Sequence, residues 1–262
     1  RAAWRELVAK HGKPRCGPPP RDAGFAVIGY GKLAGLELGY GSDLDLVFLH
    51  DSGGAQQETD GVPPLDNERF FGRLVQRLIH FLSIQTSSGR LYEVDTRLRP
   101  SGRSGLLVTS LEGFRHYQTQ DAWVWEHQAL LRSRALAGSA EVCRAFEAIR
   151  RDVLVSHVDR GKLKVEIAKM RGRMRDELSL AEAGSFDIKQ DEGGIADVEF
   201  LVDYWVLAHS GEYPELVEFP DNIRQLEGLA RVGVVPEELC LRLKDAYLAL
   251  RRRVHELALD DG

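Results

Sequence analysis

The fold is decided by residues 41–49, which read Gly-Ser-Asp-Leu-Asp-Leu-Val-Phe-Leu, and by residues 25–31, which read Phe-Ala-Val-Ile-Gly-Tyr-Gly. Apart from Asp45, residues 44–49 are apolar, which is typical of a central strand buried on both faces. The apolar run over 25–28 predicts a second buried strand, and a glycine-rich stretch over 29–41 joins the two. The sequence therefore predicts a sheet with a glycine-rich turn at its end.

Working outward, three more segments flank this core. Residues 91–98 alternate between Tyr92, Val94, Thr96 and Leu98 on one face and charged residues on the other, which predicts a third strand. From Asp66, a plausible N-cap, apolar residues recur every three or four positions as far as Leu82, which predicts an amphipathic helix. Residues 12–20 are rich in proline and glycine and are expected to form an extended connector.

Beyond residue 110 nearly every segment has the pattern of a helix. Pro236 is expected in the first turn of the last helix, whose predicted inner face carries Leu239, Leu243, Leu250, Val254 and Leu257. Strands first and helices afterwards indicate an α+β chain: an α/β unit followed by an all-helical unit. We place a connector over residues 1–19, a catalytic domain over 20–137 and a helical domain over 138–262.

Composition narrows the class of protein. The chain has 262 residues and a net charge of −5, so it lacks the basic field of a general nucleic-acid binder. Its three cysteines are far apart, which favours a reducing compartment over disulfides or structural zinc. No segment resembles a signal peptide or a membrane helix, so we expect a cytoplasmic protein with no membrane partner. The first residue is Arg1, which suggests a piece of a longer chain.

The chemistry is carried by Asp43 and Asp45, whose spacing puts both carboxylates on one face of a strand. Two such charges at the end of a buried strand cost free energy unless a cation offsets them. Oxygen ligands without nearby His or Cys favour Mg²⁺, with Mn²⁺ as the alternative. Asp95 supplies a third carboxylate if its strand pairs with this one, and three carboxylates around two metals suit in-line displacement at phosphorus. The alternative is a solvated strand end or turn.

The glycine-rich turn strengthens the case for a phosphate site. Backbone N–H groups around Gly31 are placed to cradle phosphate after a buried strand, and Lys32 and Ser42 add a charge and a hydroxyl. The glycine spacing fits neither a dinucleotide fingerprint nor a Walker A loop.

These stretches resemble the bacterial glutamine synthetase adenylyltransferases, of the polymerase-beta-type nucleotidyltransferase superfamily. The resemblance extends through Tyr-Glu-Val-Asp at 92–95, Trp-Glu-His-Gln-Ala at 125–129, and Phe-Asp-Ile-Lys-Gln-Asp-Glu-Gly-Gly at 186–194. Family enzymes have an adenylyl-removing half and an adenylylating half, and the motifs of this sequence resemble those of the C-terminal, adenylylating half. Small departures are Ala34, where glycine is expected, and Gly41, where serine is common.

The resemblance implies transfer of AMP from ATP to a tyrosine of glutamine synthetase, with release of pyrophosphate. It places Asp43, Asp45 and Asp95 at the metal positions, with Asp95 accepting the tyrosine proton, and implies control of the full-length enzyme by the nitrogen-signalling PII protein. Three alternatives stay open: phosphorolytic removal of AMP by the same fold, a non-catalytic regulatory module, and transfer to a small hydroxyl or a nucleic-acid end.

Five further residues have two interpretations each. Arg97 and Arg99 either bind the triphosphate or form ion pairs with Glu93 or Asp45. Lys189 either faces the active site or organises the loop before the helix at 195–208. Trp123 and Trp125 either stack on adenine or, as we favour, belong to the core.

Overall fold

The computed structural model describes residues 1–39, 42–85, 87, 89, 92–178 and 185–260. Two compact units interleave along the chain. The first comprises Arg1–Leu33, Ser42–Ala122 and Arg134–Ile149, and the second comprises Ala34–Gly41, Trp123–Ser133 and Arg150–Gly262. Within the described ranges, no helix is both long and apolar enough to cross a membrane.

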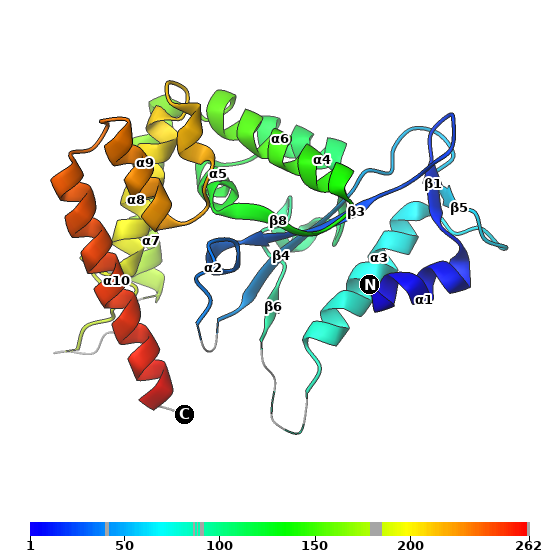
Figure 1. Ribbon diagram of the computed structural model, residues 1–262, viewed down its shortest axis with the longest axis horizontal. Helices are drawn as coiled ribbons and strands as arrows, with labels where there is room; N and C mark the ends of the chain where they lie inside the picture. The colour runs from blue at the N-terminus through cyan, green and yellow to red at the C-terminus, as the bar shows by residue number, and fades with distance from the viewer. Residues whose placement is uncertain (40–41, 86, 88, 90–91, 179–184, 261–262) are drawn as a thin grey trace. The chain divides into compact units, whose positions relative to one another are not determined.

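The sheet of the first unit is built on β3 (Phe25–Tyr30) and β4 (Leu44–His50), which pair antiparallel as Figure 1 shows. On its other edge β4 pairs in parallel with β6 (Val94–Asp95) and β7 (Thr109–Ser110), and the remaining strand, β8 (Ser133–Gly138), borders β3. Side chains of β4 are buried at nearly every position. The two predicted buried strands and the central place of the second are therefore confirmed, in a mixed α/β fold.

A helix pair, α1 (Ala2–His11) and α3 (Asn67–Leu82), packs in the same unit. The predicted N-cap of α3 is confirmed, because the Asp66 carboxylate accepts a hydrogen bond from the Arg69 N–H at 3.0 Å. Phe70, Phe71, Leu74 and Val75 form its buried stripe. The Trp4 ring of α1 meets the Phe70 ring edge-on at 5.5 Å, so aromatic packing joins the helices.

The expected connector over residues 12–20 was wrong in one respect, because it contains a strand. Pro14–Cys16 form β1, which pairs antiparallel with β2 (Arg21–Asp22) and β5 (Glu58–Thr59). Arg15 forms an ion pair with Asp60 at 3.0 Å, which ties this small sheet together. Pairing with β5, distant in sequence, supplies the hydrogen bonds that the local proline pattern does not reveal.

The predicted third strand over 91–98 was too long, since β6 covers only Val94–Asp95; Leu91 lies outside the described residues. The chain turns immediately afterwards. Arg99 closes the turn by donating from Nη1 to the Thr96 carbonyl at 2.7 Å and from Nε to the Gly105 carbonyl at 3.2 Å. Ser101 and Gly102 follow with φ of 59° and 53°, a conformation incompatible with a continuing strand.

Two helices extend the first unit after its strands. Leu111–Gln120 form α4, which Ser110 caps, and Ala140–Ser156 form α6, of which residues 140–149 belong here. The Phe114 and Phe146 rings of the two helices lie 5.8 Å apart and are fully buried. The short α2 (Gly31–Ala34) follows β3 directly.

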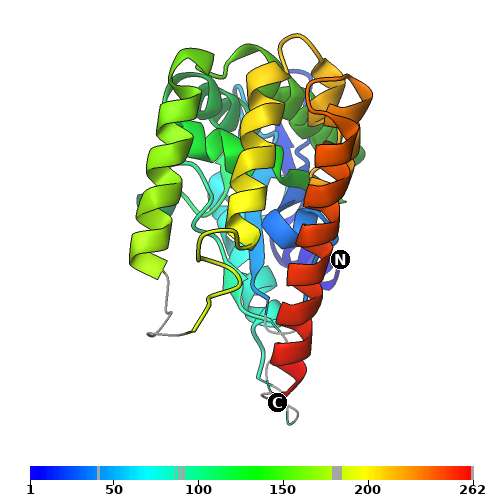
Figure 2. The same ribbon diagram turned by 90° about the vertical axis from the view of Figure 1, so that its left-hand side faces the viewer.

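The second unit is helical, and α8 (Ile195–His209) is at its centre. It packs against α5 (Val124–Leu131), α7 (Arg160–Leu178), α9 (Asn222–Arg231) and α10 (Glu237–Asp260), and against the 3₁₀ turn η2 (Pro214–Val217). Figure 2 shows α7, α8 and α10 side by side. The predicted inner face of α10 was displaced: Cys240 and Tyr247 are buried, whereas Leu239 and Leu257 are 37% and 38% exposed. Apolar spacing alone did not identify the tyrosine and cysteine that this unit buries.

His50, at the end of β4, makes acid stability testable. Its ring is buried and stacked on Phe71 at 4.8 Å, and burial lowers its pKa from 6.5 to about 4. Below pH 6.5 the unfolded chain binds this proton and the folded chain does not, so stability from this group is lost as the pH falls from about 6.5 to about 4. When the pH is lowered from about 7.5 to about 5, we expect the free energy of unfolding of His50→Gln to fall by about 2 kcal/mol less than that of the parent chain.

Urea unfolding of both chains at the two pH values measures this difference. Equal losses in parent and variant would show that His50 does not stay neutral in the fold.

Candidate active site

Asp45 and Asp95 come together because β4 and β6 pair in parallel register, with Asp45 opposite Asp95. Residues opposite one another in such a pair project from the same side of the sheet. The expectation that pairing brings Asp95 to Asp45 is confirmed. Asp43 lies just before β4 and is exposed, whereas Asp45 is partly buried.

The charges around Asp45 act on one another. Burial first, and then the charges of Asp95 and Asp43, raise the pKa of Asp45 from 3.8 to about 6, while Arg97 and Lys32 act in the opposite direction. All four side chains therefore lie close enough to Asp45 to influence its ionisation. A partly buried carboxylate with a raised pKa beside two other carboxylates is typical of a site that binds a cation.

The glycine-rich turn lies directly against this carboxylate. Gly31 follows β3 with a φ of +53°, and a Cβ at this position would lie 3.2 Å from Asp45 Oδ2. A side chain at residue 31 would both strain the backbone and crowd the carboxylate. Ser42, on the other side of the turn, is 9% exposed, and Gly41 lies outside the described residues. The structure thus brings Gly31 and Lys32 to Asp45, as the sequence predicts.

Arg97 pairs with Asp95, a partner that the sequence reasoning did not consider. Its Nε donates to Asp95 Oδ2 at 2.7 Å, and its backbone N–H donates to Oδ1 at 2.8 Å. Burial acts to raise the pKa of Asp95, but these hydrogen bonds outweigh it and the pKa is lowered. The Arg97 side chain is 63% exposed, so it can move without disturbing the core. The signal in the sequence was the Asp-x-Arg spacing at a strand end.

Arg99 is placed differently from Arg97. Its Nη2 donates to the Arg103 carbonyl at 3.1 Å, in addition to the bonds that close the turn after β6. The structure therefore gives Arg99 a role in shaping the loop that follows Asp95, and a role in binding triphosphate stays a prediction.

The oxygen atoms of Asp43, Asp45 and Asp95 show whether this site suits a divalent cation. Three carboxylates, of which Asp43 and Asp95 both act on the charge of Asp45, suit a hard cation such as Mg²⁺ or Mn²⁺, and the residues fit in this sense. Among the described residues, however, no three Asp, Glu, His or Cys side chains are already assembled to hold an ion. Because Asp95 is engaged by Arg97, completing the ligand set requires this ion pair to open.

Lys189 lies in the second unit, on a loop built by internal hydrogen bonds. The Asp187 carboxylate accepts from the N–H groups of Lys189 and Gln190 at 2.9 and 3.0 Å. Arg171 Nε donates to Asp197 at 2.6 Å, and Asp197 also accepts from the Gly193 N–H at 2.7 Å. Asp197 therefore shapes the loop, while the Lys189 side chain is exposed. The prediction that Trp123 belongs to the core was wrong, because its side chain is 63% exposed. Trp125 is partly buried.

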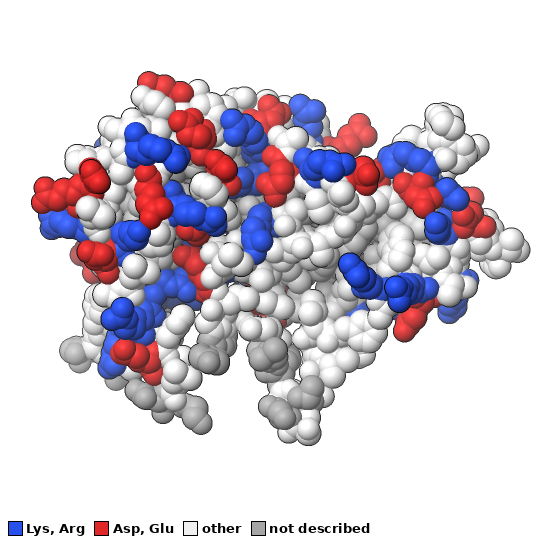
Figure 3. Space-filling model, viewed as in Figure 1, with Lys and Arg blue, Asp and Glu red and all other residues white. Residues whose placement is uncertain are grey.

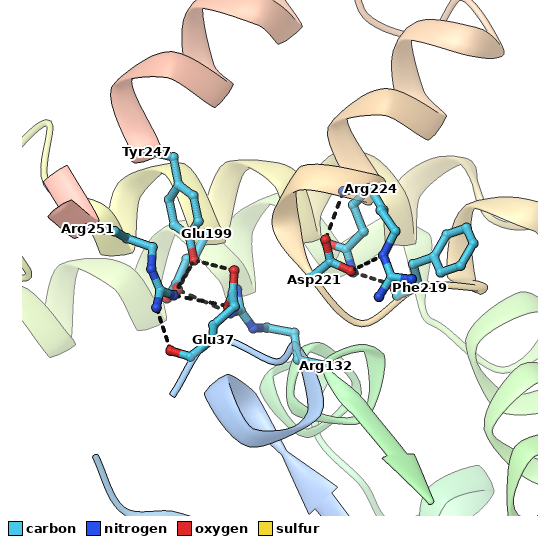
Figure 4. A network of polar contacts seen from close by, with 9 residues as sticks. Glu37, Arg132, Glu199, Phe219, Asp221, Arg224, Tyr247 and Arg251 are labelled. Atoms are coloured by element: carbon cyan, nitrogen blue, oxygen red, sulfur yellow. Dashed lines mark hydrogen bonds and ion pairs between the residues drawn. The ribbon is translucent and has the colours of Figure 1, made fainter. Parts of the chain in front are cut away.

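A buried polar network in the second unit was missed by sequence reasoning. Figure 4 shows Glu37 and Glu199 together at the end of the Arg132 side chain, whose Nη2 lies 3.1 and 3.2 Å from their carboxylates. The Tyr247 hydroxyl donates to the same two carboxylates at 3.1 and 3.2 Å. The network holds Glu37, which lies in the segment that connects Lys32 to Ser42 along the chain. The hydrogen bond from Arg251 to the Glu37 carbonyl joins residues that are 214 positions apart in the sequence, so no local sequence pattern predicts it.

A mixed sheet that sets carboxylates of parallel strands against a glycine-rich turn has the arrangement of a nucleotidyltransferase-type α+β fold. The model of the family described as "Glutamate-ammonia ligase adenylyltransferase" matches residues 1–149, and the chain belongs to this family. A second family model, described as "GlnD PII-uridylyltransferase", matches residues 162–262.

Curated relatives agree with this assignment. The chain is 55% identical over 259 residues to a bifunctional glutamine synthetase adenylyltransferase/adenylyl-removing enzyme of Thioalkalivibrio sulfidiphilus. It is 53% identical over 270 residues to the enzyme of the same description from Pseudomonas aeruginosa. Each match covers 98% of this chain and 27% of the relative, so the chain spans about a quarter of the length of these relatives.

Proposed function

We propose that this chain transfers AMP from ATP to a tyrosine hydroxyl of glutamine synthetase, releasing pyrophosphate and lowering the activity of that enzyme. The observation that carries the proposal is the register pairing of Asp45 with Asp95 against the Gly31 turn. The relatives' names, which state adenylylation of glutamine synthetase, supply the acceptor.

Each residue has a part in this reaction. Asp43, Asp45 and Asp95 would hold Mg²⁺ or Mn²⁺, which when bound neutralises charge on the α-phosphate and the leaving pyrophosphate. Asp95, which the family resemblance places next to the acceptor, would accept the tyrosine proton with its carboxylate. Backbone N–H groups at Gly31 and the ammonium of Lys32 would bind phosphate oxygens. Exposed Arg97 would turn from Asp95 to the triphosphate.

The finer architecture belongs to the same proposal. The first unit would be a polymerase-beta-type nucleotidyltransferase domain and the second a helical bundle, so that residues 123–133 join the bundle and residues 134–149 the catalytic domain, in place of a single boundary after residue 137. The match of residues 162–262 to a family named for PII uridylylation supports an interaction of the full-length enzyme with PII protein. We place the enzyme in the cytoplasm.

Two incubations test the direction of the reaction. In the first, unmodified glutamine synthetase receives ATP labelled in the α-phosphate, and we expect label on tyrosine with one pyrophosphate released per AMP transferred. In the second, the adenylylated enzyme receives phosphate, and we expect no ADP within the same time. ADP formed in the second without label transfer in the first would assign the chain to AMP removal, the reaction of the family's other half. Activity in neither would favour a regulatory module.

Lys189 provides a test of the second unit. Because its side chain is exposed on a loop held by internal hydrogen bonds, we expect Lys189→Ala to leave ATP affinity unchanged and to lower adenylylation of glutamine synthetase at least about tenfold, roughly 1.4 kcal/mol in the transition state. Turnover and ATP affinity are measured on the same folded sample. Lys164→Ala, which removes an exposed lysine from α7, is the matched control and should retain full turnover. Unchanged turnover of Lys189→Ala would limit residues 186–199 to a structural role.

A further inference from the structure

Outside the candidate active site, the first unit has a cationic hollow between α1 and α3. Its volume is about 420 Å³, and six of its lining residues are Lys10, His11, Arg73, Gln76, Arg77 and His80. In Figure 3 a few Lys and Arg side chains lie over the region of these two helices, with an acidic side chain beside them. Of the residues that line the hollow, all within the described ranges, five are basic and none is acidic.

Helix geometry explains how the hollow forms. Arg73, Arg77 and His80 recur at spacings of four and three, so they lie on one face of α3. Lys10 and His11 come from the last turn of α1, beside this face. Basic residues at a helix C-terminus favour the helix dipole, which accounts for the pair on α1. The dipole does not account for the two arginines in the middle of α3, where like charges four residues apart destabilise the helix.

The groups in the hollow are already oriented by one another. Arg73 Nη1 lies 3.1 Å from His11 Nε2. Arg77 forms an ion pair with Glu6, which lies outside the lining, and the Arg77 side chain remains 39% exposed. Leu7, 2% exposed, adds an apolar element to the lining. Guanidinium groups bind phosphate oxygens as two-pronged donors, and the Gln76 amide adds a further donor.

We propose that this hollow is a binding site for a small molecule carrying a phosphate group, with Arg73 and Arg77 as its main ligands. Its volume suits a phosphorylated metabolite rather than a bare ion, since small-molecule sites commonly measure about 300–1,000 Å³. The site lies on helices that precede and follow the core strands, and it involves none of the carboxylates near β4. It is therefore independent of the proposed adenylyl transfer.

His11 provides a readout at the site itself. Burial first, and then the charges of Arg73, Lys10 and Arg77, lower the pKa of His11; His80 also lines the hollow, and Glu6 is the nearby acid of the Arg77 pair. A bound phosphate would offset these positive charges and raise the pKa of His11. By linkage, protonation of His11 and binding of a phosphate dianion would favour each other.

The test is a titration of the 262-residue chain with inorganic phosphate, followed by NMR of the histidine rings at low salt. We expect saturable shifts of the His11 ring signals, an upward shift of its pKa, and no shift for His50, which is buried in the same unit. The double variant Arg73→Gln/Arg77→Gln should weaken binding at least about tenfold, whereas Arg69→Gln, which removes an exposed arginine one turn earlier on α3, should change it less than about twofold.

A variant that is expected to bind phosphate more tightly serves as a second test, because weaker binding alone could result from a misfolded variant. Glu6→Gln releases Arg77 from its ion pair, and we expect tighter phosphate binding. Circular dichroism melting confirms that each variant is folded. Absence of a saturable His11 shift, or an equal loss in Arg69→Gln and the double variant, would overturn the proposal, the second by showing only a diffuse cationic surface.

Discussion

Replacement of Asp45 by Asn is expected to lower AMP transfer at least about a hundredfold, because it removes a charged ligand at the centre of the carboxylate cluster. Asp45 is the group whose ionisation Asp43, Asp95, Lys32 and Arg97 all influence, so its replacement removes the charge at the centre of this cluster. Asp43→Asn and Asp95→Asn should each abolish transfer in the same way. Turnover of glutamine synthetase adenylylation by each purified variant is the measurement.

Stability should move in the opposite direction. The pKa of Asp45 in the folded chain, about 6, lies above its ordinary value of 3.8. The stability that this group contributes is therefore present below about pH 4 and lost as the pH rises through about 6. In EDTA, we expect Asp45→Asn to raise the melting temperature at about pH 8 and to change it less at about pH 5.

Asp121→Asn is the matched control for the carboxylate series. Asp121 is an exposed residue at the end of α4 in the same unit, and its replacement should leave turnover and melting temperature unchanged. If Asp45→Asn retained more than about a tenth of parental turnover, less than roughly 1.4 kcal/mol in activation free energy, Asp45 would not be a metal ligand.

The second large effect concerns ATP binding. We expect ATP affinity to fall at least about a hundredfold when EDTA replaces Mg²⁺, because without a cation the triphosphate faces three carboxylates. Isothermal titration calorimetry measures the affinity in the two buffers. The double variant Asp43→Asn/Asp45→Asn should lose this dependence on Mg²⁺, since it removes two of the three repelling charges.

Equal ATP affinity of the parent chain with Mg²⁺ and with EDTA would contradict this expectation. It would mean that Gly31, Lys32 and the arginines hold the triphosphate alone, and the carboxylates would need another explanation.

The core of the site was predictable because its signals are local. The buried strand ending at His50 and the Asp66 cap of α3 are visible in short windows, since burial and capping depend on a few adjacent residues. The sequence predicted that Asp95 would lie beside Asp45 only if their two strands pair. It could not predict that pairing itself, because one sequence does not determine which strands pair.

Features that depend on distant partners were not predictable. β1 exists because β5 pairs with it across the small sheet, and the strand carrying Asp95 ends early because Arg99 closes a turn on backbone carbonyls. Tyr247 is buried through its hydroxyl contacts with Glu37 and Glu199, although periodicity pointed to neighbouring leucines. In each case, tertiary hydrogen bonds override the local pattern.

The central claim is that Asp43, Asp45 and Asp95 together hold the divalent cations used in AMP transfer. Its most direct test is a crystal structure of the chain with Mn²⁺ and a non-hydrolysable ATP analogue, in which anomalous scattering locates each metal. We predict Mn²⁺ bound to all three carboxylates and to phosphate oxygens, with Arg97 released from Asp95. Nucleotide bound near Gly31 with no manganese at these carboxylates, or manganese bound elsewhere, would contradict the account.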